Sequence, residues 1–169
     1  MTDTTPHPSG ISVKQATLDD AEAVHALIVA LAEAQDAAHM VTSTPDDLRR
    51  DGLHEGAKLQ ALLARNATGG PVGLALYYFT YSTWTCTPVL FVEDLYVDAG
   101  LRGSGLGKRL MAGLARIARD HGCLRVSLEV KTDNQARGFY ERLGLVQKGP
   151  WLPYAVNGAA FHALADAAD

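Results

Sequence analysis

A glycine-rich segment between a strong strand pattern and a strong helix pattern is the clearest chemical feature of the sequence. It reads Val97-Asp98-Ala99-Gly100-Leu101-Arg102-Gly103-Ser104-Gly105-Leu106-Gly107-Lys108-Arg109-Leu110. The glycines let the backbone turn tightly and leave the first amide groups of the helix uncovered. These amides and the helix dipole favour an anion such as a phosphate or pyrophosphate, and Arg102, Lys108 and Arg109 add positive charge. The sequence therefore predicts a site for a phosphate-bearing ligand, although a turn without any ligand remains an alternative.

Two common nucleotide-binding patterns fit this turn less well. A Walker A loop fails because Arg102 stands where its first glycine belongs and Arg109 follows the lysine. A Rossmann fingerprint is broken by Lys108, which replaces its last glycine. Glu129 does lie about where a ribose-binding acid would be, so the Rossmann interpretation stays open as a minor alternative.

A pair of carboxylates, Glu93 and Asp94, interrupts the apolar run from Leu90 to Val97. Such groups are costly in an apolar strand unless they are paired or functional, and a structural ion pair is the alternative. Because neighbours on a strand point to opposite faces, one carboxylate is expected on each face. An aliphatic amine has a pKa of about 10.4 and is mostly protonated at neutral pH. A carboxylate can bind that cation and, directly or through water, receive its proton.

Composition limits the remaining possibilities. The chain has 169 residues, 47% of them apolar and 20% charged, with a net charge of −4. This predicts one globular domain and disfavours a disordered chain, a nucleic-acid binder or a membrane-spanning protein. Polar, Pro-containing residues 1–10 are expected to form a flexible tail rather than a signal peptide. Cys86 and Cys123 predict neither a disulfide framework nor a metal site, which favours a cytoplasmic chain.

Periodicity predicts the elements that position these residues. Helices are expected at 20–35, 45–51, 105–121 and 134–143, with a helical end at 159–167. Strands are expected at 11–16, 59–64, 72–80, 89–97 and 124–130, with two more between Val146 and Val156. Antiparallel hairpins followed by alternating strands and helices indicate a mixed-sheet α/β (α+β) fold.

Arg102, Gly105 and Gly107 meet the pattern Arg/Gln-x-x-Gly-x-Gly/Ala, and here the sequence resembles the GNAT superfamily of acyl-CoA-dependent N-acyltransferases. Further segments look like its spermidine/spermine (diamine) and thialysine N-acetyltransferase branch. They are residues 48–52, 76–84, 90–97, 139–144 and 149–151, and the likeness runs from about Ile11 to Ala165.

The resemblance implies a fold and an assembly. One GNAT domain would span residues 11–169, with a mixed six- to seven-stranded V-shaped sheet flanked by about four helices. The sheet would splay between parallel strands 89–97 and 124–130, and a bulge in the first would free backbone groups for the pantetheine arm. Members of this branch form homodimers through their C-terminal portions, so a twofold dimer is expected.

The resemblance also implies roles for particular residues. Glu93 would be the base acting through water, and Tyr140 the general acid for the leaving thiolate. Glu93, Asp94 and Trp84 would bind the amine. Acetyl-CoA, as a co-substrate and without a metal, would be held by Leu95, Tyr96, Val97, Arg102, Gly103, Ser104, Gly105, Leu106, Gly107, Lys108, Asn134 and Tyr140. Asp133 holds the spacing at which the family has its asparagine, so either Asp133 or Asn134 would contact the coenzyme.

The expected activity is acetyl transfer to a small primary amine by direct attack in a ternary complex. Ser82 and Ala30 stand where spermidine/spermine acetyltransferases carry acids, which favours a lysine- or thialysine-like acceptor over a long polyamine. Two alternatives remain. One is an acetyltransferase for an antibiotic or other xenobiotic amine, and the other is a non-catalytic CoA-binding sensor.

Overall fold

A computed structural model describes residues 10–150 and 152–167, and their contacts form two compact units. The first unit extends to Lys131, and the second starts at Thr132. Of the tail predicted at residues 1–10, only Gly10 lies among the described residues, and Trp151 also lies outside them.

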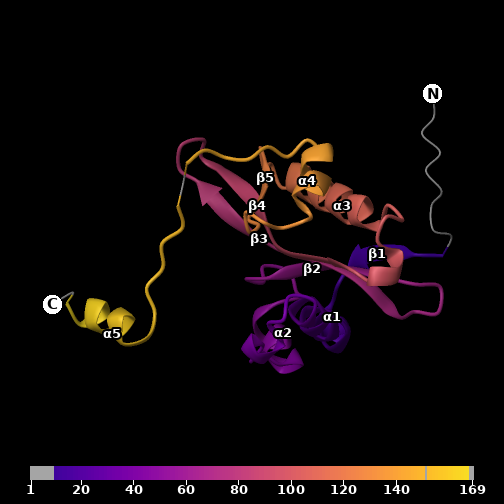
Figure 1. The fold of residues 1–169 in the computed structure, drawn as a ribbon, viewed down its shortest axis with the longest axis horizontal. Coiled ribbons are helices and arrows are strands. Elements are labelled where there is room, and N and C mark those ends of the chain that lie inside the picture. Colours follow the sequence, from indigo (N-terminus) through magenta and orange to yellow (C-terminus); the bar gives the residue numbers. More distant parts are fainter. Residues whose placement is uncertain (1–9, 151, 168–169) are drawn as a thin grey trace. The chain divides into compact units, whose positions relative to one another are not determined.

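Five strands in the first unit form one mixed sheet, in the order β1-β2-β3-β4-β5 (Figure 1). They are β1 (Ser12–Gln15), β2 (Gln60–Arg65), β3 (Pro71–Ser82), β4 (Thr87–Val97) and β5 (Val126–Leu128). Neighbours pair antiparallel from β1 to β4, whereas β5 runs parallel to β4. A parallel pair needs a crossover, which α3 (Leu106–Asp120) supplies. The predicted mixed α/β architecture is therefore confirmed.

The strand count is lower than predicted, because the two strands expected between Val146 and Val156 are absent from the described part of this segment. Pro150 and Pro153 lack the backbone N–H that a strand ladder needs, and the described residues here are exposed. An alternating apolar pattern predicts a strand only where a sheet edge can pair with it. The fifth strand is also short, since only Val126–Leu128 of the predicted 124–130 pairs with β4.

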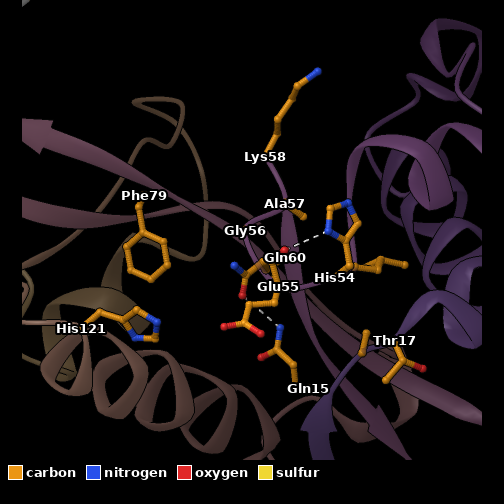
Figure 2. Close-up of a pocket in the computed structure, with 12 residues that line it drawn as sticks. Gln15, Thr17, His54, Glu55, Gly56, Ala57, Lys58, Gln60, Phe79 and His121 are labelled. Carbon is orange, nitrogen blue, oxygen red and sulfur yellow. Dashed lines mark hydrogen bonds between the residues drawn. The ribbon is translucent and has the colours of Figure 1, made fainter.

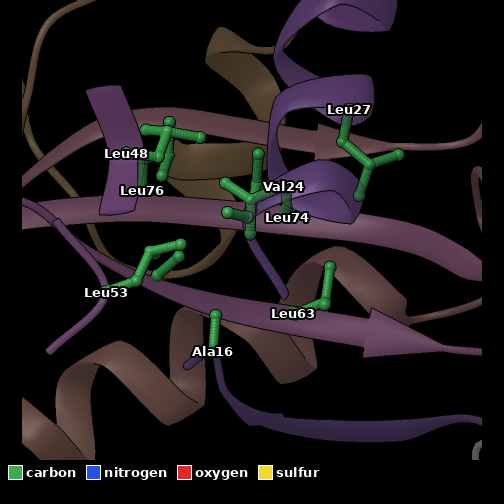
Figure 3. Close-up of a cluster of buried hydrophobic side chains, with 10 residues drawn as sticks. Ala16, Val24, Leu27, Leu48, Leu53, Leu63, Leu74 and Leu76 are labelled. Carbon is green, nitrogen blue, oxygen red and sulfur yellow. The ribbon is translucent and has the colours of Figure 1, made fainter. Parts of the chain in front are cut away.

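One face of the sheet is covered by α1 (Ala21–Glu33) and α2 (Pro45–Asp51). Apolar side chains at helical spacing on these helices meet alternate residues of β2 and β3 (Figure 3). The core between them contains Ala16, Ala21, Val24, Leu27, Leu48, Leu53, Ala61, Leu63, Leu74 and Leu76. Thr44 caps α2 by accepting a hydrogen bond from the Asp47 amide, as the predicted Pro45 start requires.

The other face of the sheet is covered by α3. Its inward positions, Leu106, Leu110 and Leu114, are fully buried at the predicted helical spacing. A side chain at Gly73 of β3 would crowd its neighbours, because a Cβ there would lie 3.3 Å from the side chains of Leu106 and Ala64. This close approach fixes the N-terminal end of α3, where the glycine-rich segment enters, against the middle of the sheet.

The second unit contains two short helices, α4 (Arg137–Arg142) and α5 (Gly158–Asp166). Both lie within or beside the predicted spans of 134–143 and 159–167. Every described side chain of α5 is exposed. Across the described residues of both units, no helix is long and apolar enough to cross a membrane.

Candidate active site

A β-bulge in β4 changes how its two acidic residues point. Tyr77 pairs with Val92 and Leu76 pairs with Asp94, so Glu93 is an extra residue without a partner on β3. In such a bulge two residues oppose one, and the simple alternation of side chains is interrupted. Glu93 and Asp94 therefore share one face, and the expectation of one carboxylate on each face is wrong. The bulge itself, implied by the family resemblance, is present.

The shared face is the one covered by α1 and α2. Asp94 lies opposite Leu76, which belongs to the core on that face, and Glu93 lies two residues after Phe91, which pairs with Tyr78. Burial raises the pKa of the half-buried Asp94 carboxyl, and the charge of Glu93 raises that pKa further. Glu93 itself is exposed. This pair of adjacent acids is suited to bind a cation and to accept a proton.

Beyond the bulge, β4 has a sheet neighbour on one side only. Its pairing with β5 ends at Val92 and Leu128, whereas its pairing with β3 continues to Val97. Along Leu95–Val97, backbone groups that point away from β3 thus face no strand among the described residues. Tyr96 packs its side chain against the core, and Arg102 Nε lies 3.5 Å from the Val97 carbonyl oxygen. This open edge matches the place predicted for the pantetheine arm.

The glycine-rich segment leads from this edge into α3. Gly103 and Gly105 have φ values of +79° and +86°, which residues with a side chain rarely adopt. Gly105 is the N-cap, and the bond that its carbonyl accepts comes from the Arg109 amide. The amides of the first helical turn before Arg109 have no acceptor within the helix. These uncommitted amides lie where the sequence predicts an anion site, at the start of a fifteen-residue helix.

Ser104 supplies a second sign that this turn receives a polar ligand. Its Oγ is buried and has no hydrogen-bond partner among the described residues. Buried hydroxyls are normally paired, so an unpaired one beside uncommitted amides fits a ligand oxygen. Arg102 and Lys108 are exposed next to it. Arg109 instead donates from Nη2 to the carbonyl of Ile11, the residue before β1, over 2.9 Å, so it ties this segment to α3 and is not a free charge for the anion.

The remaining predicted residues lie elsewhere. The predicted loop 82–88 is shorter than expected, because β3 ends at Ser82 and β4 begins at Thr87. Trp84 lies in the tight turn between them and is 92% exposed. Tyr140 and Asn134 belong to the second unit. There Tyr140 packs against Phe139 with ring centroids 5.1 Å apart. The Asn134 side chain accepts a hydrogen bond from the Ala136 amide over 2.8 Å, at the start of α4.

A separate open cavity of about 700 Å³ lies near the C-terminal end of α3 (Figure 2). Gln15, Gln60, residues 53–58, Phe79 and His121 are among those that line it, and none of the predicted site residues does. Phe79 and His121 stack with ring centroids 4.8 Å apart. The Tyr77 hydroxyl lies 3.0 Å and 2.9 Å from the Gln15 and Gln60 side-chain oxygens. These polar groups are therefore paired with one another. Because no residue of β4 lines the cavity, it is distinct from the acidic site on that strand.

Sequence reasoning missed two residues near the acids, Tyr78 and Glu129. Burial raises the pKa of the Tyr78 hydroxyl, and the negative charges of Glu93 and Glu129 raise it further. The signal for Glu129 was its place in the strand predicted at 124–130, which was expected to run parallel to β4, although the observed β5 ends one residue before it. Tyr78 gave no signal, because an aromatic residue in an apolar strand is typical of a core.

Comparison with known proteins identifies the class of this chain. Residues 24–145 match the acetyltransferase (GNAT) family. A thialysine N-epsilon-acetyltransferase from Mus musculus is 34% identical over 164 residues, which cover 90% of this chain and 96% of that protein. The chain therefore belongs to the GNAT family, and it is an acetyl-CoA-dependent N-acetyltransferase. The resemblance drawn from its motifs is confirmed.

Two further comparisons add detail. A spermidine/spermine N(1)-acetyltransferase-like protein 1 from Homo sapiens is 33% identical over 130 residues, covering 73% of this chain and 19% of that longer protein. An integron cassette protein from the mobile metagenome of V. cholerae has the same fold. The TM-score is 0.76 at 22% identity, covering 92% of this chain and 98% of that one.

Proposed function

We propose that this enzyme transfers the acetyl group of acetyl-CoA to a primary amine of a small, lysine- or thialysine-like molecule. The observation that carries the proposal is the bulge, which gives Glu93 and Asp94 one face beside the open edge of β4. The same strand leads directly into the anion site at α3. A carboxylate pair and a turn suited to pyrophosphate on one continuous segment would suit acetyl transfer from acetyl-CoA to an amine.

The residues present fit the coenzyme. The unpaired Ser104 hydroxyl and the first amides of α3 would bind the pyrophosphate, together with Arg102 and Lys108. Leu95 and Val97 would bind the pantetheine arm through their backbone groups on the open edge, with Tyr96 anchoring the strand between them. From the second unit, Asn134 or Asp133 would contact the coenzyme.

The acids would prepare the amine for attack. Asp94 would hold the ammonium group by charge, and Glu93 would take its proton through water. Trp84 would line the acceptor side. Backbone N–H groups at the bulge would stabilise negative charge on the thioester oxygen, and the Tyr140 hydroxyl would protonate the departing thiolate. Attack would be direct, and much of the rate would come from holding both substrates together.

The acceptor class rests on the relatives and on the site. The thialysine acetyltransferase matches nearly the full length of both chains, and a diamine or polyamine is the second candidate because of the spermidine/spermine-like relative. We also propose that residues 11–169 form one domain, since the family match from 24 to 145 runs across both units. A homodimer in the cytoplasm, with Cys86 and Cys123 reduced, completes the proposal.

Calorimetric titration with acetyl-CoA, followed by thiol release with thialysine, lysine, spermidine and putrescine, tests this function. Turnover should be highest with thialysine or lysine. A protein that binds acetyl-CoA but acetylates none of the four amines would favour the sensor alternative. Ser104→Ala should weaken acetyl-CoA binding about three- to tenfold, the effect of one hydrogen bond. Ser43→Ala is the matched control, because Ser43 contacts His25 through its backbone carbonyl and not through its hydroxyl, and this variant should bind acetyl-CoA as the wild type does.

A further inference from the structure

Tyr78 lies on the same face of the sheet as the two acids. It pairs with Phe91 across β3 and β4, and their rings are 5.2 Å apart. On an antiparallel pair, the residue two positions along the partner strand is the diagonal neighbour, within reach of a long side chain. For Tyr78 that neighbour is Glu93, and Leu76, two residues earlier on β3, faces Asp94.

A third acid, Glu129, directly follows the end of β5. Phe91 pairs with Ser127 in the parallel ladder, and Glu129 follows two residues after Ser127. Glu93 and Glu129 both raise the pKa of the Tyr78 hydroxyl by their negative charge, and the Glu93 carboxylate is near enough to be considered as its hydrogen-bond acceptor. The titratable groups that face Tyr78 are therefore Glu93 and Glu129, with Asp94 beside Glu93. A tyrosine hydroxyl is already protonated at neutral pH, and the raised pKa lets this phenol stay a hydrogen-bond donor further into the alkaline range.

We propose that Tyr78 is a positioning residue, which holds the Glu93 carboxylate through a hydrogen bond so that this carboxylate faces the acceptor amine. The inference rests on the proposed amine acetylation. Phe91 packs against the phenol ring and limits its movement. The bulge leaves the Glu93 backbone without a paired residue in the β3 register, so the backbone ladder does not fix its side chain. An exposed glutamate has several rotamers, and a donor on a braced ring restricts them. Tyr78 acts through Glu93 and touches neither substrate in this role.

The test combines Tyr78→Phe with Glu93→Gln in a double-mutant cycle. Tyr78→Phe keeps the ring against Phe91 and removes only the hydroxyl. It should lower kcat about tenfold, the upper effect of one hydrogen bond, with an unchanged KM for acetyl-CoA and an unchanged melting temperature. In the Glu93→Gln background the same substitution should have little further effect, because the ionised carboxylate it positions is gone. Tyr81→Phe, on the same strand but exposed, is the control and should match the wild type.

An equal fall in kcat on both backgrounds would overturn the positioning role, as would wild-type kinetics of Tyr78→Phe. A lowered melting temperature with the same loss on both backgrounds would make Tyr78 purely structural. If the wild-type enzyme acetylates no amine at all, the proposed function fails instead, and that outcome is visible before any variant is compared.

Discussion

Asp94 combines a half-buried carboxyl with an acidic neighbour in the chain. Burial raises the pKa of its carboxyl, and the neighbouring Glu93 adds to that increase. A carboxylate binds an ammonium group only when it is ionised. Its ionised fraction falls as the pH is lowered through this raised pKa, so the affinity for the amine should decline at a higher pH than an ordinary aspartate would give.

We therefore expect Asp94→Asn to raise the KM for the amine about tenfold, within the range expected for a hydrogen bond to a charged group. The KM for acetyl-CoA should not change. The pH profile of kcat/KM should lose part of its acidic limb, because the asparagine does not titrate. Asp120→Asn is a suitable control, since Asp120 pairs with Arg119 on the surface of α3. An unchanged amine KM would remove Asp94 from the acceptor site.

Two acids in an apolar strand were enough to predict a functional role for Glu93 and Asp94, which stays a prediction, but not to predict their common face. That face depends on where β3 and β4 shift register, which is set by pairing between residues far apart in the sequence. For the same reason Tyr78 looked like a core residue, because only the ladder places it beside Glu93.

At the scale of elements, the glycine-rich turn sets where α3 begins. Gly105 combines a φ of +86° with the N-cap position, and a Cβ there would meet no atom within 4 Å. The only penalty of a side chain is therefore backbone strain. Gly69, in the turn between β2 and β3, has a φ of +87° and equally open surroundings, so it offers a matched position away from the anion site.

Both Gly105→Ala and Gly69→Ala should lower the free energy of unfolding by about 1–2 kcal/mol, the cost of left-handed backbone with a side chain. Only Gly105→Ala should also weaken acetyl-CoA binding, about three- to tenfold, because the turn relaxes and its amides move. Denaturant unfolding and calorimetric titration measure the two effects. Equal coenzyme affinity in both variants would show that the Gly105 turn does not bind the pyrophosphate.

Elements defined by local spacing were predicted well. The periodicity of Leu106, Leu110 and Leu114 predicted α3, and a proline followed by acids predicted the start of α2. Strands that depend on a distant partner were less predictable. The alternating apolar residues after Val146 form no strand in the described chain, since pairing with another strand cannot be deduced from their own pattern.

At the scale of the whole molecule, the second unit exposes an unusual number of large apolar side chains. Leu152, Tyr154, Val156, Phe161 and Leu164 are all exposed. On α5, Phe161 and Leu164 are three residues apart and so share one side of the helix. Grouped apolar exposure of this kind is typical of a protein–protein contact, which agrees with the proposed homodimer.

Replacing both Phe161 and Leu164 with serine should therefore weaken the dimer. Full burial of one such side chain contributes about 1.5–3 kcal/mol, so losing two should raise the dissociation constant by at least tenfold. Sedimentation velocity over a range of concentrations measures this shift. Met40→Ser, at an exposed apolar residue of the first unit, should leave the dissociation constant unchanged. A variant as dimeric as the wild type would place the contact elsewhere. A wild-type protein that stays monomeric at all concentrations would refute the homodimer and leave the apolar side of α5 without a second copy to cover it.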